Sequence, residues 1–385
     1  MRKLLFLSIA IISIAFLLLQ STSSKKVAFA NQERSSVQSV PPAPEFVSLL
    51  AAKKRIEEMV QEENIVGLSI SISLDDTLIW SAGYGYSDLE KQTPIDPSET
   101  VFRITSIAKP FTTTILGRLY EEGKIDWTKS LYHYVPDFPK KRYDFTLQQL
   151  ALHRAGIRHY HWYEGENKKP LSIEQGLKKF KRSRLRFEPG TEYLYSSYGY
   201  NLLGVAMEKA SGQSYEQLLA EYITRPLQLE HTIADDADYK NLRTSGFFTT
   251  KGKGKVWEAE AVNMYMKLPC GGILSTSEDL VQFGNAYSYG RILQENTRQT
   301  ILLEPTLPDG KKVGYSMGWG LTIDKQGRKI ISHTGGNTGA VCRLIVYPDQ
   351  KLSIAVVSNT FGIDYLKFIR NLSSIANGIL LDIER

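Results

Sequence analysis

The sequence predicts an α/β (α+β) fold in which one antiparallel sheet is built from both ends of the chain. Apolar runs with strand character occur at residues 66–85 and again at 315–358, and short polar turns separate them. Strands joined by such tight turns pair antiparallel. The residues between, 111–309, carry apolar side chains at helical spacing interrupted by loops. We therefore expect a sheet flanked by terminal helices, with a helical region inserted in the middle.

The first 30 residues are typical of an export signal. Arg2 and Lys3 precede sixteen uncharged residues, and a small-residue segment ends at Ala30. This pattern predicts a signal peptide over residues 1–30 and a secreted, periplasmic or cell-envelope location. An uncleaved membrane anchor is the alternative, although sixteen apolar residues are short for a complete span. The polar, proline-containing residues 31–44 predict a flexible tether.

The rest of the chain is expected to form one domain with an insertion. Residues 45–64 and 363–381 have apolar residues at helical spacing and predict the terminal helices. Residues 45–110 and 310–385 together should form the sheet part, and residues 111–309 the helical insertion. The boundary of an inserted region is a frequent place for a small-molecule site.

Charge and cysteine content exclude some function classes. Four basic residues lie in the first 30, and the remaining 43 basic and 41 acidic residues give a net charge of +2. This balance gives no electrostatic argument for a nucleic-acid partner. Membrane contact is expected only through the N-terminal segment, if that segment is uncleaved. The two cysteines, Cys270 and Cys342, could form a disulfide or lie buried as small apolar residues, and they predict no Cys-ligated metal.

Ser106 and Lys109 form the stretch with the clearest chemistry. A serine hydroxyl becomes a nucleophile only when a base contacts it. Residues three apart share a helix face, so Lys109 can reach the hydroxyl if a helix begins near Ser106. The free N–H groups at that helix start would also stabilise an oxyanion. The structural alternative is that Ser106 or Thr105 caps the helix and Lys109 is solvated.

Two more stretches follow Ser-x-x-Lys along the chain. Residues 195–197 (Tyr-Ser-Ser) come after a Pro-Gly turn, and residues 333–336 (His-Thr-Gly-Gly) end a strand pattern. In this order the three stretches resemble the Ser-x-x-Lys, Tyr-x-Asn and Lys/His-Thr-Gly motifs of the serine beta-lactamase and penicillin-binding protein superfamily. The resemblance is to its class C-like (peptidase family S12-like) branch and covers nearly all of the chain after residue 45. Residues 133–139 and 156–160 look most similar to the mitochondrial serine beta-lactamase-like protein and its bacterial relatives.

The resemblance implies roles for individual residues. Ser106 would be the acylated nucleophile, with Lys109 and Tyr195 sharing proton transfer. A tyrosine could be the base only if a cation such as Lys109 lowered its pKa from about 10, so the identity of the base stays open. The backbone N–H groups of Ser106 and Gly336 would bind the oxyanion. The implied substrate contacts are Ser197, His333, Thr334 and Gly335, and no cofactor is implied.

Two positions depart from the family pattern. Ser197 stands where the family has an asparagine that donates to a substrate amide. His333 replaces a lysine, and an imidazole with an ordinary pKa near 6.5 is mostly neutral at pH 7. We therefore expect anionic substrates to bind more tightly as the pH falls through about 6.5. Both changes favour esterase or peptidase-like activity over efficient beta-lactam hydrolysis.

Two other catalytic patterns have weaker support. Gly-x-Ser-x-Gly around Ser316, followed by Asp324 and His333, imitates an α/β-hydrolase triad, but that motif needs a strand, a turn and a helix. Here the sequence continues as a strand. His159 and His161 lie two residues apart without a further ligand at metal-like spacing, so no metal site is expected.

The sequence therefore predicts an exported serine hydrolase that forms an acyl-enzyme on Ser106. Its substrate would be an ester, a small or D-amino-acid peptide, or a beta-lactam amide, including peptidoglycan-like molecules. One alternative is a penicillin-binding or sensing protein that is acylated without efficient turnover. Another is a polymerising scaffold related to the mitochondrial homologue. The oligomeric state stays open.

Overall fold

The computed structural model describes most of the chain after its N-terminal segment. The described residues are 26–27, 36–161, 164, 169–235, 245–250, 255–260 and 262–384. The expected signal peptide lies outside these ranges except for Lys26–Val27, which form strand β1. Within the described ranges, no helix has the length and apolar character needed to cross a membrane.

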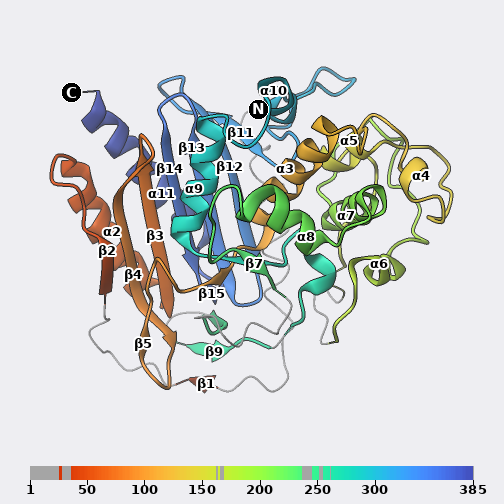
Figure 1. The fold of residues 1–385 in the computed structure, drawn as a ribbon. Helices are drawn as coiled ribbons and strands as arrows, with labels where there is room; N and C mark the ends of the chain where they lie inside the picture. Colours follow the sequence, from red (N-terminus) through yellow and green to blue (C-terminus); the bar gives the residue numbers. More distant parts are fainter. Residues whose placement is uncertain are drawn as a thin grey trace.

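The main sheet confirms the predicted antiparallel architecture. Its spatial order is β11-β12-β13-β14-β3-β4-β2, with β5 paired to β4, and every neighbouring pair is antiparallel. N-terminal strand β3 therefore lies beside C-terminal strand β14 (Figure 1). The strands are β2 (Ser36–Val40), β3 (Gly67–Leu74), β4 (Thr77–Asp88), β5 (Thr93–Pro94), β11 (Gly320–Ile323), β12 (Lys329–Asn337), β13 (Ala340–Tyr347) and β14 (Leu352–Ser358).

Part of the expected tether at residues 31–44 is instead a strand. Residues 36–40 form β2 and pair with β4, with Val37 opposite Gly83. The outer edge of β4 offers unpaired backbone groups, and the two valines of this segment favour an extended conformation. The sequence did not predict this short edge strand, because only two of its five residues are apolar and the surrounding segment is polar and contains proline.

The two terminal helices cover one face of the sheet, as predicted. Helices α2 (Val47–Glu62) and α11 (Tyr365–Ile383) share one buried apolar cluster with the sheet strands. In α11 the buried residues recur at helical spacing, and the Asp364 side chain caps its start by accepting from the Lys367 N–H at 2.9 Å. Figure 1 shows α2 at the left of the sheet and the helical region at the right.

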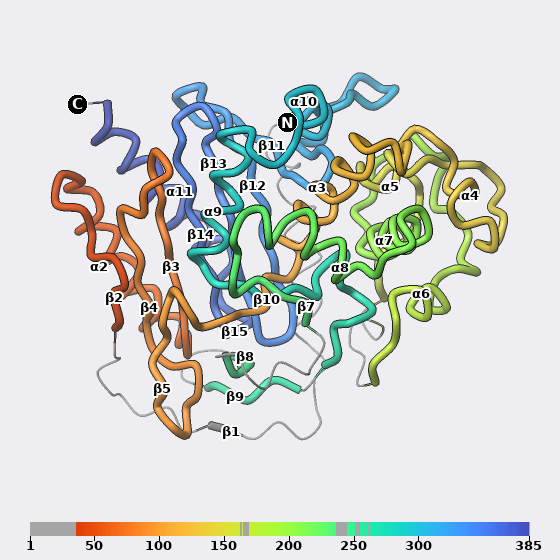
Figure 2. Tube along the Cα trace, in the orientation of Figure 1, coloured from red at the N-terminus to blue at the C-terminus, as the bar shows by residue number. Residues whose placement is uncertain are grey.

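The opposite face carries α9 and the inserted region, most of which lies to the right of the sheet in Figure 2. Its helices are α3 (Ala108–Glu121), α4 (Leu131–Tyr134), α5 (Leu147–Ala151), α6 (Ile173–Gly176), α7 (Ser197–Ser211), α8 (Tyr215–Leu219), α9 (Ser277–Ser288) and α10 (Glu295–Leu302). Shorter helical turns are η2 (Thr105–Ile107), η4 (Leu177–Lys179), η5 (Ala220–Thr224) and η6 (Tyr265–Lys267). The predicted helical patterns between 111 and 309 are thus confirmed, although several helices are shorter than expected.

Short strands outside the main sheet, from the insertion and from the segments on either side of it, were not predicted from the sequence. They form two small sheets, ordered β6-β10-β7 and β1-β9-β8-β15. Strands of two or three residues are too short to show alternation in the sequence. Their bounds are β6 (Phe102–Arg103), β7 (Ile233–Ala234), β8 (Phe248–Thr250), β9 (Val256–Glu258), β10 (Ile273–Ser275) and β15 (Thr360–Phe361).

A buried ion pair fixes β6 beside the inserted region. Arg103 Nε donates to Asp235 Oδ2 at 2.6 Å, and both side chains are only 2% exposed. Arg103 Nη2 also donates to the Val262 carbonyl at 3.0 Å. This contact holds the strand that leads directly into the turn containing Ser106.

Candidate active site

Ser106 lies in η2, and α3 begins two residues later at Ala108. This confirms a helix start next to Ser106. The residues at the cap positions are Ile104 and Ile107, and no side chain caps either segment. The alternative that Ser106 or Thr105 serves as a helix cap is therefore wrong.

Thr105 has a positive φ of 46°, an unusual conformation for a β-branched residue. Its neighbour across the molecule is Gly335 of β12, where an added Cβ would lie 1.7 Å from Thr105 Oγ1. The missing side chain thus lets β12 approach the turn that holds Ser106. Such strained residues persist only where the surroundings over-determine them, typically at functional sites. Gly335, expected to contact substrate, is instead buried against this turn.

Both cysteines are free and buried. Cys342 Sγ lies 3.4 Å from Thr105 Oγ1 and donates to the Ile104 carbonyl at 2.9 Å. Cys270 Sγ lies 3.0 Å from the Tyr160 hydroxyl. The described structure therefore favours the reading of two buried small side chains over a disulfide.

Lys109 is fully buried beside Ser106. Its Nζ donates to Ser106 Oγ at 3.1 Å and to the Cys270 carbonyl at 2.9 Å, and the side chain is 0% exposed. Among the described residues no carboxylate forms an ion pair with it. Burial without a counter-charge disfavours the ammonium form and lowers the pKa of Lys109 to about 8. A buried amine of this pKa next to a hydroxyl has the properties of a general base near neutral pH.

Tyr195 lies on the other side of the amine, with Lys109 Nζ 4.8 Å from the centre of its ring. Burial raises the pKa of Tyr195 well above 10, and hydrogen bonding with Ser106 offsets this only in part. The phenol is therefore protonated in the resting site. The geometry thus favours Lys109 over Tyr195 as the group that first accepts a proton.

Two histidines that sequence reasoning did not assign to the site hold the Tyr-Ser-Ser segment. The Ser196 N–H donates to His153 Nδ1 at 3.1 Å, and the Ser197 N–H donates to His159 Nδ1 at 3.2 Å. Both rings must be unprotonated at Nδ1 to accept these bonds, and burial lowers the pKa of each, to about 3 for His159. The rings of His153 and Tyr195 are packed with centres 4.4 Å apart. These contacts fix the backbone directly after Tyr195.

The metal alternative around His159 has no support within the described residues. No group of three His, Cys, Asp or Glu side chains there could hold a metal ion. His159 instead accepts from the backbone, as described above. Ser197 is buried at the first position of α7.

His333 differs from the sequence expectation. Its Nδ1 lies 2.9 Å from the Thr334 carbonyl, which can only accept, so Nδ1 carries the proton. Nε2 then accepts from the Tyr315 hydroxyl at 3.1 Å. Burial, reinforced by the nearby Lys109, lowers the pKa of His333 to about 3. A pKa lowered this far argues against the expected change in anion binding near pH 6.5, because the imidazole would be neutral throughout that range.

A cation nevertheless lies next to the third motif. Arg343 of β13 is the register partner of Thr334, and its Nη1 donates to Thr334 Oγ1 at 3.4 Å. Its Nε is buried without a hydrogen-bond partner. No carboxylate among the described residues pairs with this guanidinium. The sequence offered one clue, since a two-residue turn at 338–339 places residues 334 and 343 opposite each other.

Gly336 is exposed at the edge of β12, next to the buried Gly335. Strand β11 pairs with β12 only as far as Ser332, so the edge near Gly336 has no strand partner on that side. An added Cβ would meet only Phe361, at 3.6 Å. The Gly336 backbone is thus exposed at the unpaired edge of β12.

A family comparison agrees with this arrangement. The Beta-lactamase family profile matches residues 52–369. The chain belongs to the beta-lactamase family. The family predicted from the three motifs is thereby confirmed, together with its fold.

Relatives of this beta-lactamase family member include eukaryotic and bacterial proteins. Mouse serine beta-lactamase-like protein LACTB, mitochondrial, is 29% identical over 82% of this chain and 76% of its own length. Protein flp of Staphylococcus aureus strain MW2 is 25% identical over 83% of this chain and 64% of its own length. The D-amino acid amidase from Ochrobactrum anthropi SV3 superposes with a TM-score of 0.74 at 20% identity, covering 88% of this chain and 100% of that one. The similarity to the amidase, at 20% identity, shows that the two proteins share a fold.

The competing triad around Ser316 is not assembled. Ser316 is 0% exposed, and its Oγ lies 2.6 Å from the carbonyl oxygens of both Ile301 and Leu303. Asp324 is engaged by Arg328 at 2.7 Å. Ser316 is therefore a structural residue.

Proposed function

We propose that this protein is a serine hydrolase that forms an acyl-enzyme on Ser106. The observation that carries the proposal is the 3.1 Å contact between Ser106 Oγ and the fully buried, unpaired Lys109 amine. Buried titratable groups with strongly shifted pKa values occur preferentially at functional sites. Family membership adds independent support.

Acylation would begin with the neutral form of Lys109. The amine accepts the Ser106 proton while Oγ forms a bond to the substrate carbonyl carbon, and the C=O electron pair moves onto the oxygen. The backbone N–H groups of Ser106 and Gly336 would stabilise that oxyanion. When the C=O bond re-forms, the bond to the leaving group breaks, and Tyr195 donates its phenolic proton to that group. The Lys109 ammonium then returns a proton to Tyr195.

Deacylation would repeat these steps with water as the nucleophile. Lys109, neutral again, accepts a proton from water as its oxygen attacks the acyl carbon. Collapse of the second oxyanion breaks the bond to Ser106 Oγ, which takes its proton from the Lys109 ammonium, so that the amine is neutral again. The acid product then leaves. The backbone contacts of His153 and His159 would keep Tyr195 in place through both half-reactions.

The surroundings favour small esters or amides, including those of D-amino acids, over beta-lactams. Ser197, buried at the start of α7, has no side-chain amide with which to donate to a substrate amide. The fold shared with a D-amino acid amidase supports the same substrate class. The unpaired Arg343 beside Thr334 would favour substrates that carry an anionic group.

Intact-protein mass spectrometry after treatment with a fluorophosphonate and, separately, a penicillin tests the proposal. The wild type should gain one fluorophosphonate adduct, and Ser106→Ala should gain none. Ser316→Ala is the matched control, because it removes another buried serine hydroxyl and should be labelled like the wild type. Labelling that persists in Ser106→Ala would overturn the proposed nucleophile.

The time course separates the remaining functions. A penicillin adduct that decays indicates beta-lactam turnover. One that persists indicates a penicillin-binding or sensing protein. Fluorophosphonate labelling without any penicillin adduct supports the esterase or amidase that we propose. Absence of both adducts in a folded wild type would favour a scaffold role without catalysis.

A further inference from the structure

The Gly-x-Ser-x-Gly segment, residues 314–318, does not supply the nucleophile, but it lies against the candidate site. Gly314 and Gly318 have φ values of 72° and 78°, which favour glycine, so the chain turns at both ends of the segment. The Leu321 N–H of β11 donates to the Gly314 carbonyl at 2.8 Å. Between the two turns lies Tyr315, which is only 6% exposed. The segment therefore presents a buried phenol from a backbone that is fixed to the sheet.

The end of this segment packs on the first turns of α3. A Cβ added to Gly318 would lie 2.9 Å from the Lys109 carbonyl oxygen and 2.6 Å from Thr113 Oγ1. Thr113 Oγ1 also donates to the Met317 carbonyl at 3.1 Å. Any shift of the helix that carries Lys109 relative to residues 317–318 would break these contacts. The backbone next to Tyr315 is thus tied to the first of the three motifs.

The Tyr315 side chain joins the second motif to the third. Its hydroxyl donates to His333 Nε2 at 3.1 Å. Its ring centre lies 6.2 Å from that of Tyr195, with the two rings nearly perpendicular at 87°, and 5.0 Å from that of His153. Edge-to-face aromatic pairs at this separation attract each other. One side chain therefore contacts the first residue of both the Tyr-Ser-Ser and the His-Thr-Gly-Gly stretches.

Both ring nitrogens of His333 are used within the protein. Nδ1 donates to the Thr334 carbonyl at 2.9 Å, and Nε2 accepts from Tyr315. A neutral imidazole has one donor and one acceptor, so no hydrogen-bonding group of the ring remains for a substrate. His333 is also only 7% exposed. The side chain that the family resemblance implied as a substrate contact instead orients the Thr334 backbone, from which β12 continues to Gly336.

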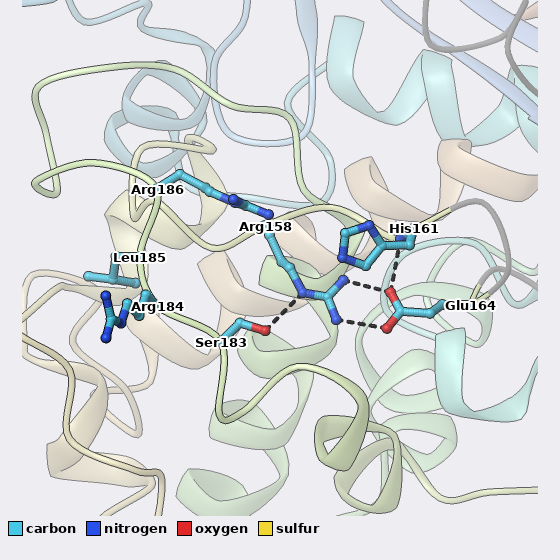
Figure 3. Close-up of a pocket in the computed structure, with 7 residues that line it drawn as sticks. All are labelled: Arg158, His161, Glu164, Ser183, Arg184, Leu185 and Arg186. Atoms are coloured by element: carbon cyan, nitrogen blue, oxygen red, sulfur yellow. Dashed lines mark hydrogen bonds and ion pairs between the residues drawn. The ribbon is translucent and has the colours of Figure 1, made fainter.

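Other supports of Tyr195 belong to the helical region. Ser196 Oγ donates to the Arg158 carbonyl at 2.8 Å. Figure 3 shows both carboxylate oxygens of Glu164 holding the Arg158 side chain, at 2.6 and 2.8 Å. These contacts fix the segment after Tyr195 within the insertion, but they do not reach β12, whereas the hydroxyl of Tyr315 does.

We propose that Tyr315 is a positioning residue of this site, acting through His333 to hold β12 against the turn that carries Ser106. This inference rests on the proposed acyl-enzyme function. The Gly336 N–H lies three residues farther along β12 and would bind the oxyanion, a charge that exists only after Ser106 attacks. A misplacement of about 1 Å at such a group can slow a reaction by roughly a hundredfold. Loss of the Tyr315 hydroxyl should therefore lower the maximal rate of acylation more than it weakens substrate binding.

Acylation of Ser106 by an uncharged activated ester, followed by intact mass at several ester concentrations, tests the proposal. Tyr315→Phe keeps the ring and removes the hydroxyl. It should lower the maximal rate about tenfold, as expected for one buried hydrogen bond, and change the half-saturating concentration by less than about twofold. In a His333→Leu background the same change should have no further effect, because the hydroxyl has already lost its partner. Equal losses in both backgrounds would show that Tyr315 does not act through His333.

The matched control is Tyr287→Phe. Tyr287 is 0% exposed, and its hydroxyl lies 2.5 Å from Thr114 Oγ1 on α3, so this change also removes one buried tyrosine hydroxyl. Tyr287→Phe and Tyr315→Phe should lower the urea midpoint of unfolding by similar amounts, yet Tyr287→Phe should be acylated at the wild-type rate. Equal slowing of acylation in both variants would mean that Tyr315 only packs the core.

A second readout does not require catalysis, so it separates a failure of this inference from a failure of the proposed function. Two-bond proton–nitrogen correlation spectra at pH 7 report which imidazole nitrogen carries the proton, and His333→Leu identifies the His333 signals. The wild type should show a protonated Nδ1 and an unprotonated Nε2, and Tyr315→Phe should shift the Nε2 signal. An Nε2 signal that does not respond to loss of the hydroxyl, or a proton on Nε2 in the wild type, would overturn the inference even if Ser106 is acylated. The expected spectra in a protein that is never acylated would overturn the proposed function and leave the contact with His333 standing.

Discussion

Two buried cations six residues apart in the sequence have opposite surroundings. Arg103 is 2% exposed and pairs with Asp235 at 2.6 Å. Lys109 is 0% exposed and has only a hydroxyl and a carbonyl as hydrogen-bond partners. The first cation is compensated, so it holds β6 in place. The second is uncompensated, so its pKa falls to about 8 and it becomes able to accept a proton.

The difference shows that a counter-ion determines whether a buried cation stabilises the fold or can act as a base. A paired buried charge is costly to disrupt because the remaining partner is stranded. An unpaired buried amine weakens the fold at neutral pH yet supplies a base. Arg103 and Lys109 lie on consecutive parts of one segment. The ion pair that holds β6 therefore lies directly before the turn and helix that carry Ser106 and Lys109.

Replacing Lys109 should abolish the chemistry while leaving the fold intact. Lys109→Met keeps the length and apolar stem of the side chain and removes the amine. Acylation of Ser106 by an activated ester should slow by about 10³-fold or more, because the hydroxyl loses its base. Single-turnover kinetics followed by mass would measure this. A loss of less than tenfold would show that another group is the base.

Removing the counter-ion of Arg103 should damage stability. Asp235→Ala leaves a buried guanidinium unpaired and should lower the free energy of unfolding by about 3–5 kcal/mol. Urea unfolding at pH 7 measures this difference. The control is Asp309→Ala, which breaks the exposed pair with Lys311 and should change the free energy of unfolding far less. Equal costs for the two variants would contradict the assigned role of the buried pair.

The unpaired amine should make stability depend on pH in a specific direction. The pKa of Lys109 is about 8 in the folded state and 10.5 as its ordinary value, so the unfolded state binds more protons between these values. Wild-type stability should therefore rise relative to Lys109→Met as the pH increases from 8 to 10.5, by up to about 3 kcal/mol. Parallel unfolding curves at each pH would show it. A constant difference would mean that the amine is not perturbed.

The rate of Ser106 acylation by an uncharged ester should follow the same titration. It should rise about tenfold per pH unit below pH 8 and level off above it, since only neutral Lys109 accepts a proton. His333 should add no inflection near pH 6.5, because burial lowers its pKa to about 3. A bell-shaped profile centred near pH 6.5 would argue that a histidine, not the lysine, is the base.

The smallest effect is expected at Arg343, an unpaired cation at the rim of the site. Arg343→Gln should raise KM by about tenfold for an ester that carries a carboxylate, because a charge-assisted hydrogen bond is lost. The neutral amide analogue of that ester should be unaffected. An equal rise for both substrates would indicate a packing role for Arg343 instead.

Features that depend on local pattern could be predicted from the sequence. The β3–β4 hairpin followed from two apolar runs separated by a short turn, and Asp75 and Asp76 indeed adopt positive φ values of 46° and 66° there. The proximity of Ser106 and Lys109 followed from helical spacing within one turn. Both depend on residues that are neighbours in the chain.

Features that depend on burial and on long-range contacts could not be predicted from the sequence. The contact of His159 with Ser197 spans 38 residues without a sequence motif. The neutral state of His333 follows from its enclosure, which composition does not reveal. The edge strand β2 forms because a partner strand is available, not because its own sequence is strongly apolar.

The contact between Thr105 and the strand hairpin that contains Gly335 and Cys342 also has a consequence for biosynthesis. Thr105 Oγ1 touches Cys342, a residue made 237 positions later. Strand β3 likewise waits for β14 before it gains its second neighbour. A growing chain therefore exposes Ser106 and Lys109 long before the residues that enclose them are synthesised. If burial of Lys109 is what makes Ser106 reactive, Ser106 in the nascent protein stays unreactive until the last third of the chain has been translated.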